Sequence, residues 1–255
     1  MKNEIANITH EHIYSFVASH NIDDIIYIES QDPQFLAISH TYHKIKSEYI
    51  DNIKSNDILF LDLVTKISLI TYQIGGTWED WWNDVMNYIY QNWSKINLEK
   101  INDTAWRNEL LQNTKYNRRL KNMKLARLSK IWNLRDIFDD IQDYKTAYED
   151  MYIYHTKIID KIWAKSTAKT PLFATKMFGY ICRVIFGKLV VYPDWLSIPI
   201  DSRLTQIYNH IHNIQEKNDK DILVFFDDIA QKNHISSLHL DSLLWLKYWK
   251  LINIS

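Results

Sequence analysis

The scarcity of turn-forming residues constrains this chain more than any other feature of its sequence. Its 255 residues include only four glycines and four prolines. Folds built from β-strands need many tight turns, and glycine and proline supply the backbone conformations that those turns require. The scarcity therefore predicts an all-α protein whose helices are capped by Asn, Asp and Ser. A short strand is conceivable only near residues 188–192.

Hydrophobic periodicity indicates where the helices lie. The segment 58–74 is apolar almost all round and ends at Gly75-Gly76, which is typical of a buried central helix. We expect one or two helices across 135–162, and single helices at 79–93, 120–130, 169–186, 201–216, 220–232 and 238–251. The length of the chain permits one large domain or two small ones that share a core.

Charge and cysteine content exclude several classes of protein. Lys and Arg number 30 and Asp and Glu number 31, so the charge of the whole chain predicts no polyanionic partner. The single cysteine, Cys182, excludes an internal disulfide and suits a reducing compartment. The most apolar stretch, 177–192, is interrupted by Arg183 and Lys188, and the N-terminus is polar. We therefore expect a cytoplasmic protein without a membrane span.

The histidines do not predict a metal site. The chain has 10 of them, but no HExxH motif, and the pairs at 10/12 and 210/212 are spaced i, i+2, which places them on different helix faces. His40 and His43 could share a face, yet no third ligand lies nearby in sequence. We expect no metal and no cofactor.

Two windows concentrate the positive charge. The window 115–130 contains Lys115, Arg118, Arg119, Lys121, Lys124, Arg127 and Lys130 and no acidic residue. The window 161–193 contains Lys161, Lys165, Lys169, Lys176, Arg183 and Lys188, again without an acid. Each window could be a solvated helix face or a surface for DNA phosphates. The chain is also rich in Trp and Tyr, and aromatic rings beside a basic surface are suited to holding an unstacked base.

The motif AKTPLFATKMFGYICR (168–183) places two lysines and a phenylalanine on one helix face. Lys169, Phe173 and Lys176 are spaced i, i+4 and i+7, so two amines bracket an aromatic ring. Neighbouring cations and the positive end of a helix favour a neutral amine, which can act as a nucleophile. A lysine on a solvated or phosphate-binding face has the same pattern, so this motif alone leaves both interpretations open.

Two further motifs contain carboxylates that could take part in the chemistry. SIPIDSRL presents Asp201 at the start of a helix, where Asp is also a common N-cap. LHLDSLLWL places Asp241 and Trp245 at i and i+4, on one helix face. That face could hold a carboxylate acceptor beside a large ring, or it could dock a C-terminal helix against the rest of the fold.

Taken together, these motifs resemble those of the archaeal 8-oxoguanine DNA glycosylases, the AGOG family of the helix-hairpin-helix glycosylase superfamily. The similarity is collinear over most of the chain. It runs through ESQDPQF, LITYQIGGTWEDWW, the basic window that starts at Lys115, AKTPLFATKM, SIPIDSRL and LHLDSLLWL. The resemblance implies a bifunctional enzyme that flips 8-oxoguanine out of double-stranded DNA, excises it through a lysine Schiff base, and cuts the strand by β-elimination.

The resemblance also implies roles for particular residues. Lys169 would be the nucleophile and Asp201 the second catalytic residue. The base pocket would consist of Gln34, Trp82, Phe173, Lys176, Asp241 and Trp245, and the DNA backbone would contact Lys115, Arg118, Arg119, Lys121 and Lys124. The implied fold is two helical subdomains with the base in a cleft between them. We place these subdomains at 1–55 plus 178–255 and at 56–177 of one glycosylase unit, 1–255, which we expect to be a monomer.

Three departures from the family pattern accompany the resemblance. Trp78 stands where the family usually has a small residue, Pro171 replaces an aliphatic residue, and the superfamily's glycine-rich hairpin is absent. Two other functions remain open on the residues alone. A non-catalytic helical DNA-binding module would use the same basic windows, and a protein-interaction scaffold would bind DNA weakly and without preference for a lesion.

Overall fold

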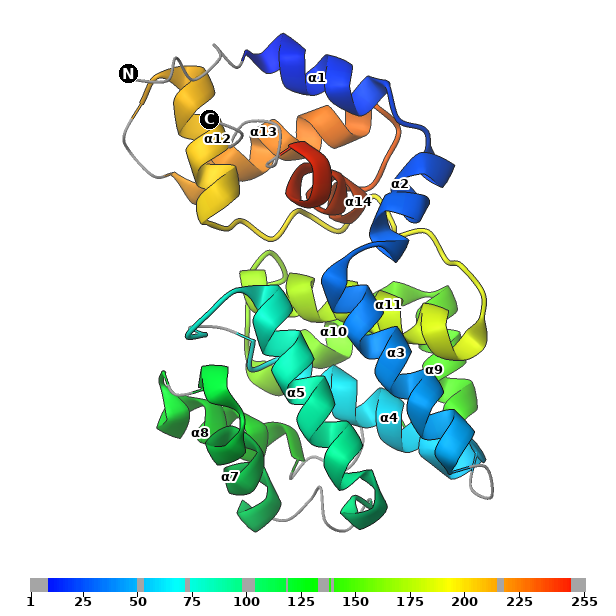
Figure 1. The fold of residues 1–255 in the computed structure, drawn as a ribbon. Helices are drawn as coiled ribbons and strands as arrows, with labels where there is room; N and C mark the ends of the chain where they lie inside the picture. Colours follow the sequence, from blue (N-terminus) through cyan, green and yellow to red (C-terminus); the bar gives the residue numbers. More distant parts are fainter. Residues whose placement is uncertain are drawn as a thin grey trace, which may run out of the picture. The chain divides into compact units, whose positions relative to one another are not determined.

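The computed structural model describes residues 9–49, 53–71, 74–97, 104–117, 119–132, 138, 140–214 and 218–248, and these contain helices and no strand. The helices are α1 (His10–Ala18), α2 (Ile22–Ser30), α3 (Pro33–Glu48), α4 (Ile53–Ser68), α5 (Trp78–Asn92), α7 (Thr104–Asn113), α8 (Lys121–Trp132), α9 (Ile141–Glu149), α10 (Met151–Ile162), α11 (Lys169–Phe186), α12 (Ser202–His212), α13 (Asp219–Lys232) and α14 (Ser237–Leu243) (Figure 1). Short turns of 3₁₀-helix follow as η2 (Trp93–Lys95) and η3 (Lys115–Asn117), and a π-helix, η4 (Leu244–Tyr248), continues α14. The all-α prediction is confirmed.

The chain divides into two compact units. The continuous unit is Pro33–Val190, and the split unit combines Met1–Asp32 with Val191–Ser255. The sequence also predicted a unit built from two separated segments, but with boundaries near 55 and 178. The structure moves both boundaries because α3 packs against α4, α5 and α11, so the whole of α3 and α11 belongs to the continuous unit.

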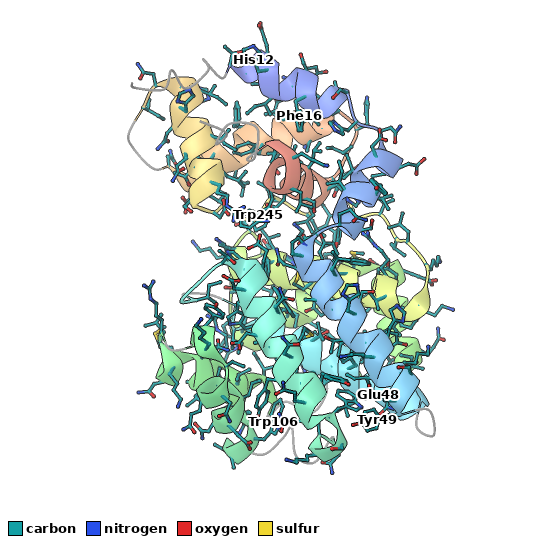
Figure 2. All side chains as sticks on the ribbon, viewed as in Figure 1. His12, Phe16, Glu48, Tyr49, Trp106 and Trp245 are labelled. Carbon is teal, nitrogen blue, oxygen red and sulfur yellow. The ribbon has the colours of Figure 1, made fainter. Side chains whose placement is uncertain are left out.

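Two buried helices form the centre of the continuous unit. Every residue from 59 to 71 is buried, and so is every residue from 171 to 182. The buried helix predicted at 58–74 is therefore present as α4, although it begins earlier and ends at Ser68. Its buried charges are paired within the helix, since Lys66 contacts Asp62 at 2.6 Å. α5 packs along α3, and Tyr90 near the end of α5 donates a hydrogen bond to Glu48 at 2.7 Å. Figure 2 labels Glu48 at the end of α3.

The split unit has its own hydrophobic core, which α1, α2, α12, α13 and α14 enclose. His239 of α14 connects its parts. The backbone N–H of Tyr192 donates to His239 Nε2 at 3.2 Å, so the ring proton is on Nδ1, which donates to Glu29 of α2 at 2.8 Å. Glu29 and His239 are both fully buried, and this bond fixes the helix that carries Asp241 and Trp245.

Most of the predicted helices lie where the pattern placed them, and the region 135–162 holds α9 and α10. The sequence analysis missed α1, α2, α3 and α7. The first two begin with capping boxes at Thr9 and Asn21, whose partner three residues on is His12 or Asp24 rather than the usual Glu or Gln. Residues 188–192 form no strand and have no regular secondary structure. The hydroxyl of Tyr148 donates to the carbonyl of Lys188 and accepts from the N–H of Val190.

Among the described helices, none is both long enough and apolar enough to cross a bilayer.

Candidate active site

Lys169 is the first residue of α11 and is exposed. Its Nζ lies 5.4 Å from the centroid of the Trp78 ring, and that ring lies 4.4 Å from the ring of Phe173. The predicted helix face is therefore present, and Trp78 at the start of α5 extends it. Trp78, which departs from the pattern of the family that the sequence resembles, thus gives the lysine amine an aromatic wall.

Deeper along the same helix, Lys176 is almost fully buried at 2% exposure. Its Nζ lies 5.8 Å from the centroid of the Tyr180 ring. Phe35 packs edge-on against Tyr180 at 5.4 Å, which brings the first turn of α3 beside the middle of α11. Gln34, the residue before Phe35, is buried in that turn. The structure therefore assembles Lys176 and Gln34 on two packed helices of the continuous unit.

The two adjacent tryptophans of α5 have different roles. Trp81 and Trp82 are both fully buried and pack edge to face at 5.1 Å. The indole N–H of Trp81 donates to Asn117 at 2.9 Å, which is a structural bond. The indole nitrogen of Trp82 has no hydrogen-bond partner among the described residues. A buried donor without a partner is costly, so Trp82 Nε1 is suited to a ligand acceptor.

The glycine pair before α5 packs against the basic turn η3. The N–H of Gly75 donates to the carbonyl of Tyr116 at 3.0 Å. A Cβ on Gly76 would lie 2.5 Å from Cε1 of Tyr116, so a side chain there would displace the ring. Only glycine permits this close approach, which connects η3 with its exposed Lys115 to the loop that leads into Trp78.

The structure revises part of the predicted DNA-backbone set. Lys115 and Arg119 are exposed, Lys121 is partly exposed, and Arg118 lies outside the described residues. Lys124 is fully buried, and its amine donates to Asn117 Oδ1 at 3.0 Å. Burial lowers the pKa of Lys124 to about 8. The expectation that Lys124 contacts a phosphate was wrong, because α8 is amphipathic and this cation faces its interior side.

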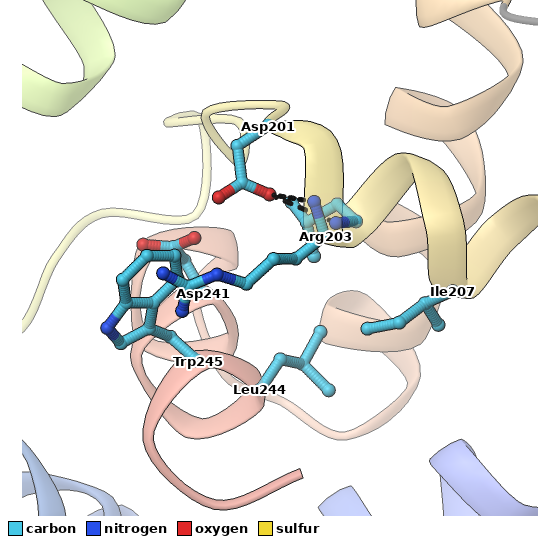
Figure 3. A pocket seen from close by; sticks show the side chains of 7 residues that line it. Asp201, Arg203, Ile207, Asp241, Leu244 and Trp245 are labelled. Carbon is cyan, nitrogen blue, oxygen red and sulfur yellow. Dashed lines mark hydrogen bonds between the residues drawn. The ribbon is translucent and has the colours of Figure 1, made fainter. Parts of the chain in front are cut away.

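In the split unit, an extended segment delivers Asp201 to the start of α12. Leu196 and Ile198 are fully buried and anchor this segment. One carboxylate oxygen of Asp201, Oδ1, accepts hydrogen bonds from the backbone N–H groups of Arg203 and Leu204 at 2.9 and 3.0 Å (Figure 3). Asp201 is therefore the N-cap that the sequence anticipated, and Oδ2 takes no part in the capping bonds.

A pocket in the split unit is lined by Asp201, Arg203, Leu204, Ile207, Asp241, Leu244 and Trp245 (Figure 3). The predicted residues Asp201, Asp241 and Trp245 thus lie together. Trp245 stands on η4, and a π-helical turn changes the direction of a side chain relative to an α-helix. The guanidinium group of Arg203 lies over the face of the Trp245 ring, so a planar ligand stacked on that face would displace Arg203.

Asp227, which the sequence analysis missed, is hydrogen-bonded to both segments that carry the candidate carboxylates. Asp227 of α13 accepts hydrogen bonds from Ser197 at 3.0 Å and from Ser237 at 2.6 Å. Ser197 belongs to the extended segment before Asp201, and Ser237 is the first residue of α14. No local pattern marks Asp227, because its partners lie 30 and 10 residues away. Arg203 and Trp78 lie within the motifs quoted above, but the spacing of residues in those motifs did not indicate a function for either.

The predicted site residues therefore form two sets. The continuous unit holds Lys169, Phe173, Lys176, Gln34 and Trp82, and the split unit holds Asp201, Asp241 and Trp245. Within the described residues, no three His, Cys, Asp or Glu side chains come together as a metal-ligand group.

Comparisons with known proteins give a consistent result. The family model described as AGOG, N-glycosylase/DNA lyase, matches residues 15–254. The chain is 31% identical to the N-glycosylase/DNA lyase of Methanococcus maripaludis over 207 residues, which cover 79% of this chain and 78% of that protein. It is 31% identical to that of Thermococcus kodakarensis over 218 residues, which cover 85% and 75%.

The fold is similar to a solved structure. The 8-oxoguanine DNA glycosylase from Pyrobaculum aerophilum, crystallised with 8-oxoguanosine, matches with a TM-score of 0.69 at 17% sequence identity. The match covers 93% of this chain and 86% of that one.

Proposed function

This chain belongs to the AGOG family of N-glycosylase/DNA lyases, and from this premise we propose that it excises 8-oxoguanine from double-stranded DNA and cuts the strand at the resulting site. Family membership decides for an enzyme against the non-catalytic DNA-binding module and the interaction scaffold. The observation that carries the proposal is the position of Lys169, at the start of a buried helix and against the ring of Trp78, which in turn packs on Phe173.

Lys169 is the nucleophile in this proposal. Its neutral amine attacks C1′ of the sugar, the glycosidic bond breaks, and the base leaves with the electron pair of that bond and takes up a proton. Opening of the sugar ring gives a Schiff base between C1′ and Nζ. Loss of a proton from C2′ then expels the 3′ phosphate by β-elimination, and water releases the lysine.

Asp201 supports this chemistry through its second carboxylate oxygen. The capping bonds to the backbone of α12 engage Oδ1 and fix the orientation of the group. Oδ2 can then stabilise the positive charge that develops on the sugar, or accept a proton from the amine of Lys169. In this arrangement the helix cap positions the catalytic oxygen.

The base is recognised by stacking and by its edge. Phe173 and Trp245 stack on the flipped base, while Gln34, Lys176 and the indole N–H of Trp82 meet its polar edge. Guanine and 8-oxoguanine differ at N7, which is an acceptor in guanine and an N–H donor in the lesion. The Asp241 carboxylate can accept that N–H and would face another acceptor if guanine entered. Asp241 is partly exposed in the protein alone, so the cost of about 1–3 kcal/mol for an unpaired acceptor applies where the bound base buries it.

Borohydride trapping tests the nucleophile. A labelled duplex with one 8-oxoguanine is incubated with the protein and borohydride, and the covalent adduct is mapped. We expect the adduct at Lys169, and Lys169→Gln should lose both base release and trapping while duplex affinity stays nearly unchanged. Lys232→Gln removes an exposed amine that pairs with Asp228 at 2.7 Å and is the matched control. Trapping that survives in Lys169→Gln contradicts the assignment.

We further propose that the enzyme acts in the cytoplasm as a monomer, which suits a protein that clamps a duplex. Analytical sedimentation with and without a lesion duplex measures the oligomeric state. One protein per duplex is the expected stoichiometry, and a stable dimer in both states would contradict it.

A further inference from the structure

Trp163 is the most exposed large hydrophobic residue of the described chain, with 85% of its surface accessible. It caps the C-terminus of α10 in the left-handed region, with φ 52° and ψ 49°, which is uncommon for a residue other than glycine. It opens the hairpin, residues 163–168, that leads directly into Lys169. A single exposed ring is ordinary on a protein surface, but this one also stands in a left-handed backbone conformation that costs energy for a bulky residue.

The structure brings the two basic windows together at this ring. Lys130, the last cation of the first window, lies on α8 with its Nζ 5.0 Å from the centroid of the Trp163 ring. Lys161 and Lys165 of the second window flank Trp163 in sequence, and Lys165 is exposed. The exposed Asp160 is the acid nearest to the hairpin in sequence. An aromatic face with one amine beside it and two more lysines close in sequence complements a strand of nucleic acid, whose phosphates meet the amines while a base meets the ring.

The hairpin holds the ring in place rather than leaving it on a loose segment. His155 of α10 binds the carbonyl of Ser166 through Nε2 at 3.1 Å and the hydroxyl of Thr175 through Nδ1 at 2.8 Å. The N–H of Ala168 also donates to the carbonyl of Lys165 at 3.0 Å. Trp163 therefore projects from an ordered turn a few residues from Lys169.

We propose that Trp163 is a DNA contact whose ring stacks on a nucleobase of the strand that the enzyme engages next to the lesion. The proposal rests on the proposed function and adds to it a binding residue outside the base pocket. Stacking on an aromatic ring is tolerant of sequence, because every base has a π-face. The contact therefore adds affinity without reading the base.

Salt dependence of binding separates stacking from phosphate contacts. The probe is a duplex that contains a tetrahydrofuran abasic analogue, and its Kd is measured by fluorescence anisotropy at several salt concentrations. We expect Trp163→Ala to raise Kd roughly tenfold at every salt concentration, with the slope of log Kd against log salt unchanged. Lys165→Gln should instead reduce that slope by about one phosphate contact.

Two further variants serve as controls for this test. Trp163→Phe retains an aromatic ring under the same backbone strain and should restore most of the affinity, which a folding defect would not allow. Tyr152→Ala removes another exposed ring from α10, 59% accessible, and should leave Kd unchanged. An unchanged Kd in Trp163→Ala, or a loss of affinity that comes with a smaller slope, overturns the proposal. An unchanged Kd would redirect attention to a protein partner for this ring.

Failure of this contact and failure of the proposed function can be told apart by experiment. Base release from an 8-oxoguanine duplex is measured separately with the wild-type protein. If that activity is absent while Trp163→Ala weakens DNA binding, the substrate assignment fails and the contact stands. If the activity is present while Trp163→Ala binds normally, the contact alone fails.

Discussion

At the scale of single residues, the proposed mechanism gives Asp201 a chemical task beside its structural one. Oδ1 caps α12, and the proposal assigns the chemistry to Oδ2, so substitutions can remove the tasks one at a time. Asp201→Asn keeps an oxygen that accepts the same backbone N–H groups, because Asn and Asp are comparable N-caps. Its thermal stability should stay close to wild type while single-turnover base release falls by orders of magnitude.

Asp201→Ala removes the cap as well. We expect the same loss of turnover together with a loss of about 1 kcal/mol in the free energy of unfolding. Chemical denaturation and a quenched excision assay measure the two effects. An Asp201→Asn protein that is fully active would reduce Asp201 to a helix cap.

The sequence predicted the positions of side chains correctly where their spacing along one helix was enough. It failed where one had to know which side of a helix faces the protein interior. The spacing of Lys169, Phe173 and Lys176 depends only on helix geometry, so the amino-acid sequence was enough to predict their shared face. Lys124 belongs to an equally clear basic pattern, but the pattern does not say which side of α8 is buried. No local sequence pattern indicated a role for Asp227, because both of its hydrogen-bond partners come from other segments.

At the scale of elements, a buried histidine fastens the hairpin between α10 and α11. His155 donates from Nε2 to the carbonyl of Ser166 at 3.1 Å, and its Nδ1 lies 2.8 Å from the hydroxyl of Thr175. Burial holds the pKa of His155 below its ordinary value. The native state thus binds this proton less readily than the unfolded chain, and stability falls as pH drops through the range below about 6.5.

His155→Leu removes this titration. We expect it to lower the free energy of unfolding at pH 7.5 by about 1–3 kcal/mol, since it leaves hairpin groups unpaired. It should also show a smaller further loss between pH 7 and pH 5 than the wild type does. Urea unfolding across that range measures both effects, and parallel pH curves for the two proteins would contradict the role given to the imidazole.

Helices could be predicted where an apolar face or a clear terminus marked them. α11 lies at 169–186 as expected, because it is apolar along one side and ends at Gly187 in the left-handed conformation. α1 and α2 are short, and their capping partners are His12 and Asp24, so the usual start signals were absent. α3 begins at Pro33, a residue that suits a first helical turn but equally suits a loop.

At the scale of the whole molecule, buried titratable groups shape the dependence of stability on pH. Lys124 has a pKa lowered to about 8 by burial, whereas its value in the unfolded chain is near 10.4. The unfolded state therefore binds more protons between these values, and stability rises with pH across that window. Tyr88 and Tyr148, whose pKa values burial raises to about 12, act in the opposite direction above pH 10.

Lys124→Met isolates this contribution. Asn117 keeps its bond from Trp81, so the variant loses an amine without leaving that acceptor bare. We expect the free energy of unfolding of the wild type to increase between pH 8 and pH 10 relative to the variant. Guanidinium unfolding at fixed pH values measures the difference. A constant difference across the window would show that Lys124 titrates as an ordinary lysine.

The overall class of fold followed from composition, but the division into units did not. Scarce glycine and proline exclude a strand-rich fold whatever the tertiary contacts are. The unit boundaries depend on which helices α3 and α11 touch, and those contacts join segments far apart in sequence. The boundaries could therefore be placed only by the structure.

The separated segments of the split unit have a consequence for biosynthesis. Residues 33–190 emerge from the ribosome in one piece and can begin to pack as they appear, whereas the early residues 1–32 must wait for 191–255. A nascent chain halted soon after residue 190 would thus carry Lys169 and lack Asp201. If the proposed mechanism holds, such incomplete products of translation would be poor at cutting DNA.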